Sequence, residues 1–127
     1  METVILIMQI GLALLFVYFG SLKVFLPFEK IKSKVSWAED YPVSRLRLFG
    51  FIEIIGGLGL ILPHQLNIFP ILTPMAATGL AMVMAGAAMV HLKRDEFANI
   101  FLNIFIIFLL AGIGFNTLLE VFHTTEI

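Results

Sequence analysis

The side chain with the clearest potential for chemistry is Glu53, which lies in the apolar stretch FGFIEIIGGLGLILP at residues 49–63. An ionised carboxylate is costly inside a membrane, so Glu53 is expected to face other helices, to be paired, or to be protonated. Gly50 and Gly57 lie on the same helical face, at i−3 and i+4, and would let a neighbouring helix approach closely. Two interpretations are open: a ligand-binding or proton-accepting carboxylate, or a clamp between helices.

Asn103 is a second candidate for ligand binding or proton transfer at this site. It lies about six residues into the last apolar segment. Glu53 lies at a similar depth, ~10 Å beyond Leu46, the first residue of its own span, at 1.5 Å per residue. Asn99 lies one turn away from Asn103 on the same stripe. A plain interhelical hydrogen bond is the alternative role for Asn103.

Three further candidates lie near the ends of apolar segments. Lys23 closes the first segment, and its long stem can reach inward or snorkel outward. His91 closes the third segment, either as part of a cluster with Glu53 or as an interfacial histidine near lipid headgroups. Tyr18 has a suitable depth, but it is five residues from Lys23, so the two side chains cannot point at the same partner.

The composition is that of a membrane protein. Of the 127 residues, 60% are hydrophobic and 13% are charged, and the mean hydropathy is +1.02. Soluble domains are about a quarter charged. The net charge of −1 gives no reason to expect a nucleic-acid partner. The absence of cysteine excludes disulfides, thiolate metal sites and dithiol relays, and three scattered histidines predict no metal site.

Four segments are apolar and long enough to cross a membrane, which takes about 20 residues. Pro63 is expected to end the second segment, and Pro70 and Pro74 to begin the third. Short connections after the second and third segments make neighbouring helices antiparallel. The sequence therefore predicts one domain over 1–127, an all-α integral membrane protein with an antiparallel four-helix transmembrane bundle, whose spans are 4–22, 46–62, 71–90 and 98–119.

The basic residues predict the orientation of the bundle. All eight lie in two places: six around the connection between the first two spans, and Lys93 and Arg94 in the turn between the last two. By the positive-inside rule, both of these connections are expected in the cytoplasm and both termini outside.

The first connection, with the sequence PFEKIKSKVSWAEDYPVS, has its own amphipathic pattern. Phe28, Ile31 and Val35 recur at helical spacing, with lysines between them and with Trp37 and Tyr41 following. This pattern is typical of a short interfacial helix anchored in the headgroups by aromatic rings. A docking surface for another protein is the alternative.

In the half of the bundle nearer the termini, Gln9 and Asn116 are expected to bond neighbouring backbone or each other, and His64 is expected in an exposed turn.

Small residues mark the faces on which the spans are expected to pack. Small-residue faces can pack within one bundle or between protomers of a homo-oligomer. The predicted packing residues are Gly20, Gly50, Gly56, Gly57, Ala77, Ala81 and Ala88.

Three stretches of the chain together resemble the DoxX-like family of small four-span bacterial membrane proteins: YFGSLKVF, RLFGFIEIIGGLGLILP and AAMVHLKRDEF. The resemblance implies a multi-pass protein of the bacterial cytoplasmic membrane. It also implies a link to quinone or sulfur redox chemistry, with a quinone or another small hydrophobic molecule as ligand and subunits of a membrane redox complex as partners. The lack of cysteine argues against electron transfer by the chain itself.

Three functions therefore compete. The first is an accessory or ligand-binding subunit of a membrane redox system, with a buried polar layer around Glu53. The second is a structural or interaction protein in which that layer only fixes the fold. The third is a small proton-coupled exporter, which a membrane glutamate suggests but which the one-sided charge distribution opposes.

Overall fold

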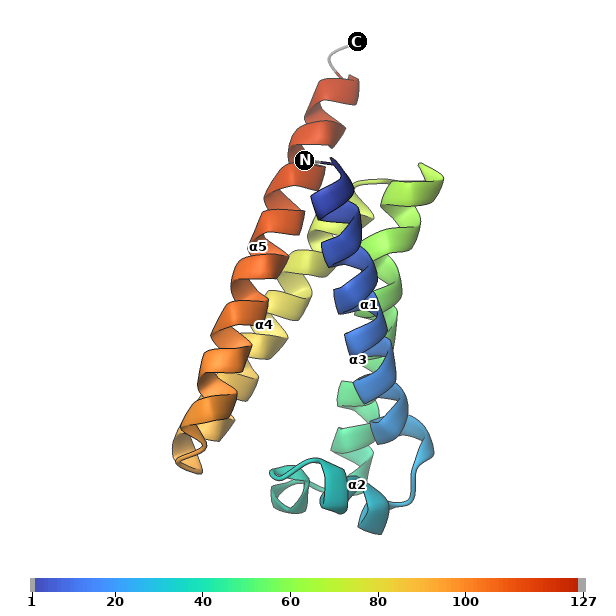
Figure 1. The fold of residues 1–127 in the computed structure, drawn as a ribbon. Helices are drawn as coiled ribbons and strands as arrows, with labels where there is room; N and C mark the ends of the chain where they lie inside the picture. The colour runs from blue at the N-terminus through green and yellow to red at the C-terminus, as the bar shows by residue number, and fades with distance from the viewer. Residues whose placement is uncertain (1, 126–127) are drawn as a thin grey trace.

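The computed structural model describes residues 2–125, and within that range the chain is helical and contains no strand (Figure 1). Four of the helices are long and apolar enough to cross a membrane, which confirms the predicted helical membrane bundle. The elements in chain order are α1 (Glu2–Phe25), α2 (Phe28–Lys34), the 3-10 helix η1 (Ala38–Asp40), α3 (Val43–Leu66), α4 (Leu72–Lys93) and α5 (Phe97–Thr125).

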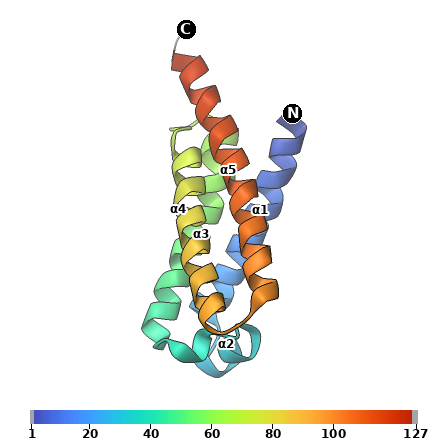
Figure 2. The same ribbon diagram turned by 90° about the vertical axis from the view of Figure 1, so that its left-hand side faces the viewer.

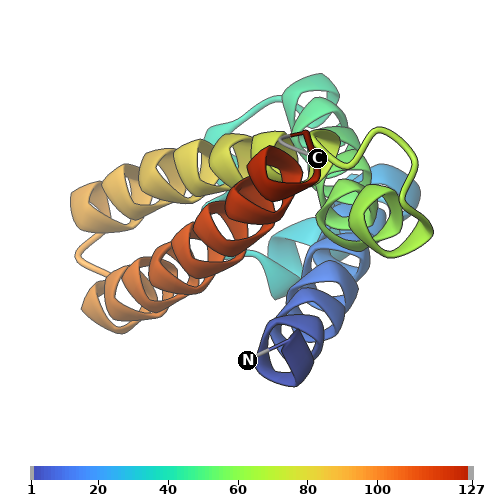
Figure 3. The ribbon, with the colours of Figure 1, turned by 90° about the horizontal axis from the view of Figure 1, so that it is seen from above.

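The four long helices are arranged as two pairs. α1 packs along α3, and α4 packs along α5, while α1 and α5 touch over only a short length. The pairs meet near the α3–α4 turn and diverge toward the opposite end (Figure 1). α2 lies at this opposite end (Figures 1 and 2). Seen from above, α4 and α5 run side by side at an angle to α1 and α3 (Figure 3). We call the end with residues 26–42 and the α4–α5 turn the basic end, and the opposite end the far end.

The main hydrophobic core lies where the two pairs meet. It draws side chains from all four long helices, so it fixes one pair against the other. Its buried members are Leu12, Phe16, Leu60, Ala77, Leu80, Ile106, Leu110 and Ile113.

A second apolar cluster holds the first connection against the basic end. Ile31 of α2 and Ala38 of η1 are fully buried, and they pack with Val35 and with Leu46 of α3. The amphipathic pattern thus turns its apolar side onto the protein's own helices. Its placement in the membrane interface stays a prediction.

Glycines set the crossing of α1 and α3. A Cβ built on Gly20 would lie 2.5 Å from the carbonyl oxygen of Gly50, and a Cβ on Gly50 would lie 2.5 Å from that of Gly20. No side chain larger than hydrogen fits at either position without moving the backbone. Lys23 and Glu53 each follow one of these glycines by three residues, so the close crossing brings both ionic side chains to the same point.

The prediction that Pro63 ends its helix is wrong, because α3 continues through it to Leu66. A proline inside a helix has no N–H for the carbonyl one turn earlier, here that of Gly59. The hydroxyl of Thr73, from α4, donates to this oxygen at 2.9 Å and replaces the missing hydrogen bond.

Two more polar contacts complete the backbone around the proline. The backbone N–H of His64 donates to Oγ1 of Thr73 at 3.2 Å, and Nε2 of Gln9 in α1 donates to the carbonyl of Leu60 at 2.8 Å. Gln9 therefore bonds neighbouring backbone, as predicted. Because neighbouring helices supply these groups, the proline is tolerated within an apolar span.

The helices are longer than the apolar segments that predicted them, since apolarity marks the lipid-facing length and a helix can continue beyond it. At its end α1 depends on α3: Nη1 of Arg47 donates to the carbonyls of Lys23 (3.0 Å), Val24 (2.7 Å) and Leu26 (2.6 Å). The last carbonyls of a helix have no partner within it, and a cation at a helix C-terminus is favourable.

Candidate functional site

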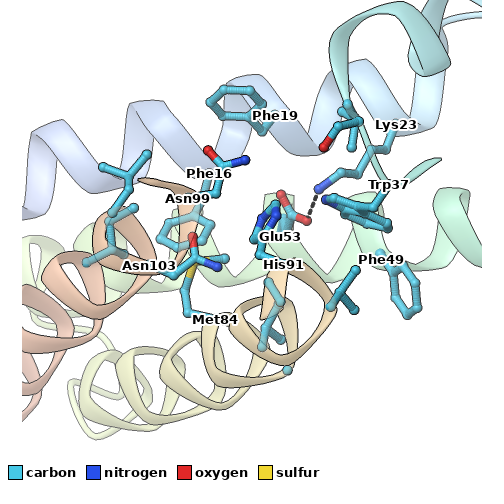
Figure 4. Close-up of a pocket in the computed structure, with 18 of the residues that line it drawn as sticks. Phe16, Phe19, Lys23, Trp37, Phe49, Glu53, Met84, His91, Asn99 and Asn103 are labelled. Carbon is cyan, nitrogen blue, oxygen red and sulfur yellow. Dashed lines mark hydrogen bonds and ion pairs between the residues drawn. The ribbon is translucent and has the colours of Figure 1, made fainter. Parts of the chain in front are cut away.

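A cavity of about 600 Å³ lies between the two helix pairs in the half toward the basic end. α1, α3, α4 and α5 form its walls, and the residues that follow α2 close it at the basic end (Figure 4). Most of the lining is apolar or aromatic. The polar lining residues are Lys23, Lys34, Ser36, Glu53, His91, Asn99 and Asn103.

Lys23 and Glu53 form a buried ion pair on the wall of this cavity (Figure 4). Their side chains are only 7% and 5% exposed. The ammonium also lies 5.2 Å from the centre of the Trp37 ring, within the range of a cation–π interaction. Glu53 therefore both faces other helices and is paired, as expected. Lys23 reaches inward, which was one of its two expected directions.

Asn103 lines the same cavity but does not bond Glu53. It lies on α5, across the cavity from α1, and the figure shows it near Met84 (Figure 4). The side chain is 7% exposed, and Nδ2 has no hydrogen-bond partner among the described residues. Asn99, one turn closer to the basic end, also lines the cavity. The interhelical hydrogen bond considered for Asn103 is absent from the part of the chain that the structure describes.

His91 lines the cavity and is 8% exposed. Its Nδ1 lies 2.9 Å from Oε1 of Glu96 in the α4–α5 turn. The hydrogen bond from His91, and to a smaller extent one from Ser36, holds the pKa of Glu96 below its ordinary value of 4.5. His91 therefore links the cavity wall to the charged residues of the basic end.

The charged residues of the basic end connect the two helix pairs. Arg94, at the end of α4, donates from Nη1 to Oδ2 of Asp40 at 2.7 Å and from Nη2 to Oε1 of Glu39 at 3.3 Å. Both carboxylates belong to η1, in the connection between α1 and α3. The residues that close the cavity are thus tied to α4 by Arg94.

Three aromatic residues at the basic end line the cavity, although the sequence did not predict this. Trp37, Tyr41 and Phe49 all line the cavity, and the centres of their rings lie 5.5 to 6.2 Å apart. The sequence suggested membrane anchors for Trp37 and Tyr41 because both follow an amphipathic segment. Their inward position depends on the packing of that segment against Leu46, which no local pattern encodes.

Tyr18 lies outside the cavity. Its side chain is 57% exposed on the outer surface of α1 and contacts the edge of the Phe19 ring. Since Lys23 points inward, this placement agrees with the argument that Tyr18 and Lys23 face different ways.

Most of the predicted packing residues lie at the α1–α3 contact, at the α3–α4 contact, or in and beside the main core. A Cβ on Gly57 would lie 3.1 Å from the carbonyl of Ala13 in α1, whereas one on Gly56 would lie 2.6 Å from Cδ2 of Leu80 in α4. Ala77 lies in the main core, Ala81 packs beside it, and Ala88 is half-buried.

The far end carries a smaller hollow with its own polar residues. His64 lies within α3, not in the exposed turn that was predicted, and its side chain is 17% exposed. Its Nε2 pairs with Glu120 of α5, and its Nδ1 lies 3.2 Å from Nε2 of Gln9. Asn116 Oδ1 is buried and has no hydrogen-bond partner within the described range. The continuation of α3 past Pro63 explains the error, because it keeps His64 within the bundle.

The groups that line the cavity are suited to bind a small molecule. The buried acid and base are paired with each other, and residues 2–125 contain no group of three acidic, histidine or cysteine side chains placed to hold a metal ion. The remaining polar groups, amides and an imidazole, can donate or accept hydrogen bonds. An apolar cavity with a few polar groups is the usual form of a small-molecule site.

The comparison with known proteins identifies a family. The model of the DoxX-like family matches residues 7–113, which is most of the chain. No curated protein and no solved structure matches it.

Proposed function

The chain belongs to the DoxX-like family of membrane proteins, and we propose that it is a ligand-binding subunit that holds a small hydrophobic molecule in the cavity between its two helix pairs. One observation carries this proposal: a cavity of about 600 Å³ brings Glu53, Lys23, His91 and Asn103 to one apolar space. This volume is within the usual range for ligand sites, about 300–1,000 Å³.

We further propose that the ligand is used by a membrane redox complex and that a quinone is the first molecule to test. This follows from the family resemblance and not from the geometry. Because the chain has no cysteine, partner subunits would carry the electron transfer. The role of this chain would be to hold the ligand within their reach.

Trp37 is the only tryptophan in the chain and lines the cavity, so its fluorescence tests the proposal directly. Decylubiquinone would be titrated into the protein in lipid nanodiscs. Binding in the cavity predicts saturable quenching of Trp37. A control protein with Trp37→Phe and Phe115→Trp moves the reporter to a side chain that is 68% exposed, where only unsaturable quenching by membrane-dissolved quinone is expected.

A pair of glycines on α4 supplies a matched blocking experiment. A Cβ on Gly86 or on Gly79 meets no atom within 4 Å, but only Gly86 lines the cavity. Gly86→Leu is expected to weaken the saturable quenching, and Gly79→Leu to leave it unchanged. Equal quenching curves for both variants, or no saturable phase in the wild type, would contradict quinone binding in the cavity. Mass spectrometry of small molecules that co-purify in mild detergent then tests for other ligands.

A structural role for the polar layer is the second candidate, and the direct Lys23–Glu53 ion pair favours it. The pair joins α1 to α3, as a clamp would. Glu53→Gln separates the two roles: a clamp predicts lower stability with unchanged quinone quenching, whereas a binding group predicts altered quenching as well.

We also propose that the basic end faces the cytoplasm, because it carries all eight basic residues. The natural lack of cysteine allows a clean test with single cysteines at Lys32, Lys93 and Gln65. In whole cells an impermeant thiol reagent is expected to label only the cysteine at position 65. Labelling at position 32 would reverse the orientation.

A further inference from the structure

Asn103 is the buried polar group of the cavity whose hydrogen bonding is incomplete. Its side chain is more than nine-tenths buried, and its Nδ2 has no partner in the part of the chain that the structure describes. Buried amide groups are almost always hydrogen-bonded, and one without a partner is destabilising. Such a group at the wall of a cavity is explained if a bound molecule completes it.

We propose that Asn103 selects the ligand of this cavity: an uncharged, membrane-dissolved amphiphile whose head carries an acceptor oxygen, to which Asn103 donates. This inference rests on the proposed function and specifies the chemical class of its ligand.

The chemistry of an asparagine amide defines the complementary atom. Nδ2 carries two hydrogens and no acceptor site, so its partner has to be an acceptor. In the structure Nδ2 has neither a partner nor accessible surface, so the amide has to rotate to bring this donor to the cavity, where a bound acceptor would complete it. Asn99, four residues earlier and ~6 Å along the helix axis, offers a second amide to the same head.

The ion pair explains why the head is uncharged. Lys23 is already paired with Glu53, and the other lysine of the lining, Lys34, is an exposed residue of α2 at the basic end. An anionic head would lie beside the carboxylate of Glu53 and a cationic head beside the ammonium of Lys23, and each adds a repulsion in an apolar space where charges are weakly screened. A carbonyl or ether oxygen meets neither repulsion.

The openings of the cavity indicate that the ligand comes from the bilayer. Three residues of its lining are substantially exposed: Phe19 of α1 by 38%, Ile52 of α3 by 42%, and Leu102 of α5 by 55%. α1 and α5, which carry two of these residues, make few contacts with each other. At the basic end the chain from Val35 to Tyr41 lies across the cavity. A tail can therefore extend between helices into lipid while the head reaches Asn103.

Three probes with similar tails and different heads test the proposal: 2-tridecanone, dodecanoate and tridecane. Binding to the protein in nanodiscs at pH 8 is followed by the emission shift of Trp37 as water leaves its surroundings. We expect 2-tridecanone to bind about tenfold more tightly than tridecane and more tightly than dodecanoate. The comparison is repeated with Asn103→Leu, which keeps the volume but removes the amide.

The proposal predicts that Asn103→Leu reduces the preference for ketone over alkane from about tenfold to about onefold, with tridecane affinity retained. Asn116→Leu is the matched control, because Asn116 is on the same helix, also has an unpartnered buried amide atom, and lies outside the cavity. It is expected to leave the preference unchanged. The ratio between two probes on one variant does not depend on how either substitution alters stability.

The outcomes separate this inference from the proposed function. If the probes bind with affinities that ignore the head, or if Asn103→Leu leaves the ketone preference intact, Asn103 does not select the ligand although the cavity binds one. Tighter binding of dodecanoate than of the ketone would overturn the uncharged head. If no probe shifts Trp37 emission at saturation and no small molecule co-purifies, the proposed function itself fails.

Discussion

Removal of one partner of the Lys23–Glu53 pair should be more destabilising than removal of both. Lys23→Met leaves the carboxylate of Glu53 buried without its cation, at 5% exposure. Breaking a buried ion pair in this way typically costs ~3–5 kcal/mol, whereas replacing both partners by apolar side chains is often neutral or stabilising. We expect Lys23→Met to lose stability in that range, and the double variant Lys23→Met with Glu53→Leu to stay within ~1 kcal/mol of the wild type.

The two single variants should differ in a direction that the structure sets. In Glu53→Leu the ammonium of Lys23 keeps the face of Trp37, 5.2 Å from the ring centre. A cation–π contact contributes roughly 0.5–2 kcal/mol, more when desolvated. Lys23→Met leaves the carboxylate with no comparable contact. Glu53→Leu should therefore be the milder change, by about 1 kcal/mol.

Unfolding in mixed micelles by titration with SDS, followed by far-ultraviolet circular dichroism, measures these free energies. Lys32→Met is the control, because Lys32 pairs with Glu29 at 3.1 Å on the surface, where the Glu29 side chain is 82% exposed. Such a pair contributes less than ~1 kcal/mol. If Lys23→Met costs no more than Lys32→Met, or if the double variant loses the sum of the single losses, the pair is not the buried, coupled pair described above.

Three further comparisons test the packing and the electrostatics, each by the same SDS titration. Gly50→Ala should lower the free energy of unfolding by ~1–3 kcal/mol, because its Cβ would meet backbone. The control Gly79→Ala, whose Cβ meets nothing within 4 Å, should lose no stability and can gain up to ~1 kcal/mol from helix propensity. Equal effects of the two substitutions would refute the close crossing of α1 and α3. Thr73→Val should cost ~1–3 kcal/mol by leaving a buried carbonyl unsatisfied next to the helical proline, and a change below ~0.5 kcal/mol would show that the hydroxyl is not needed there. Hydrogen bonds lower the pKa of Glu96 in the folded state, so its contribution to stability should be complete at neutral pH and be lost as the pH falls below about 4.5. Glu96→Gln should therefore flatten this part of the profile of stability against pH. An unchanged profile would contradict the link between Glu96 and His91.

The spans and the inward, paired position of Glu53 could be predicted because both follow from local properties of the chain. Apolar length identifies a membrane helix whatever surrounds it, and a carboxylate within such a helix is expensive wherever it points. The Lys23–Glu53 pair was within reach of the same reasoning. Gly20 precedes Lys23 by three residues and Gly50 precedes Glu53 by three, and two helices that cross at their glycines bring the next turn of each together.

The role of Pro63 could not be predicted, because its cost depends on residues that are distant in sequence. A proline alone predicts a helix end. Whether the freed carbonyl finds a donor depends on Thr73 in the next helix, and the backbone of the following turn depends on Gln9 in the first. The position of His64 follows from that outcome, so one tertiary compensation produced both errors.

The cavity is the space between the two helix pairs, and the helices of the α1–α3 pair hold each other by contacts of their own. α1 and α3 are joined by the glycine crossing, by the ion pair and by Arg47 at the end of α1. The two pairs meet through the main core toward the far end and through Arg94 with η1 at the basic end. The cavity lies between these two contacts, and the Lys23–Glu53 ion pair on its wall joins helices of the same pair. A ligand can therefore fill or leave the cavity without breaking a helix pair, and Asn103→Leu, which removes no hydrogen bond within the described residues, should change binding far more than it changes the fold.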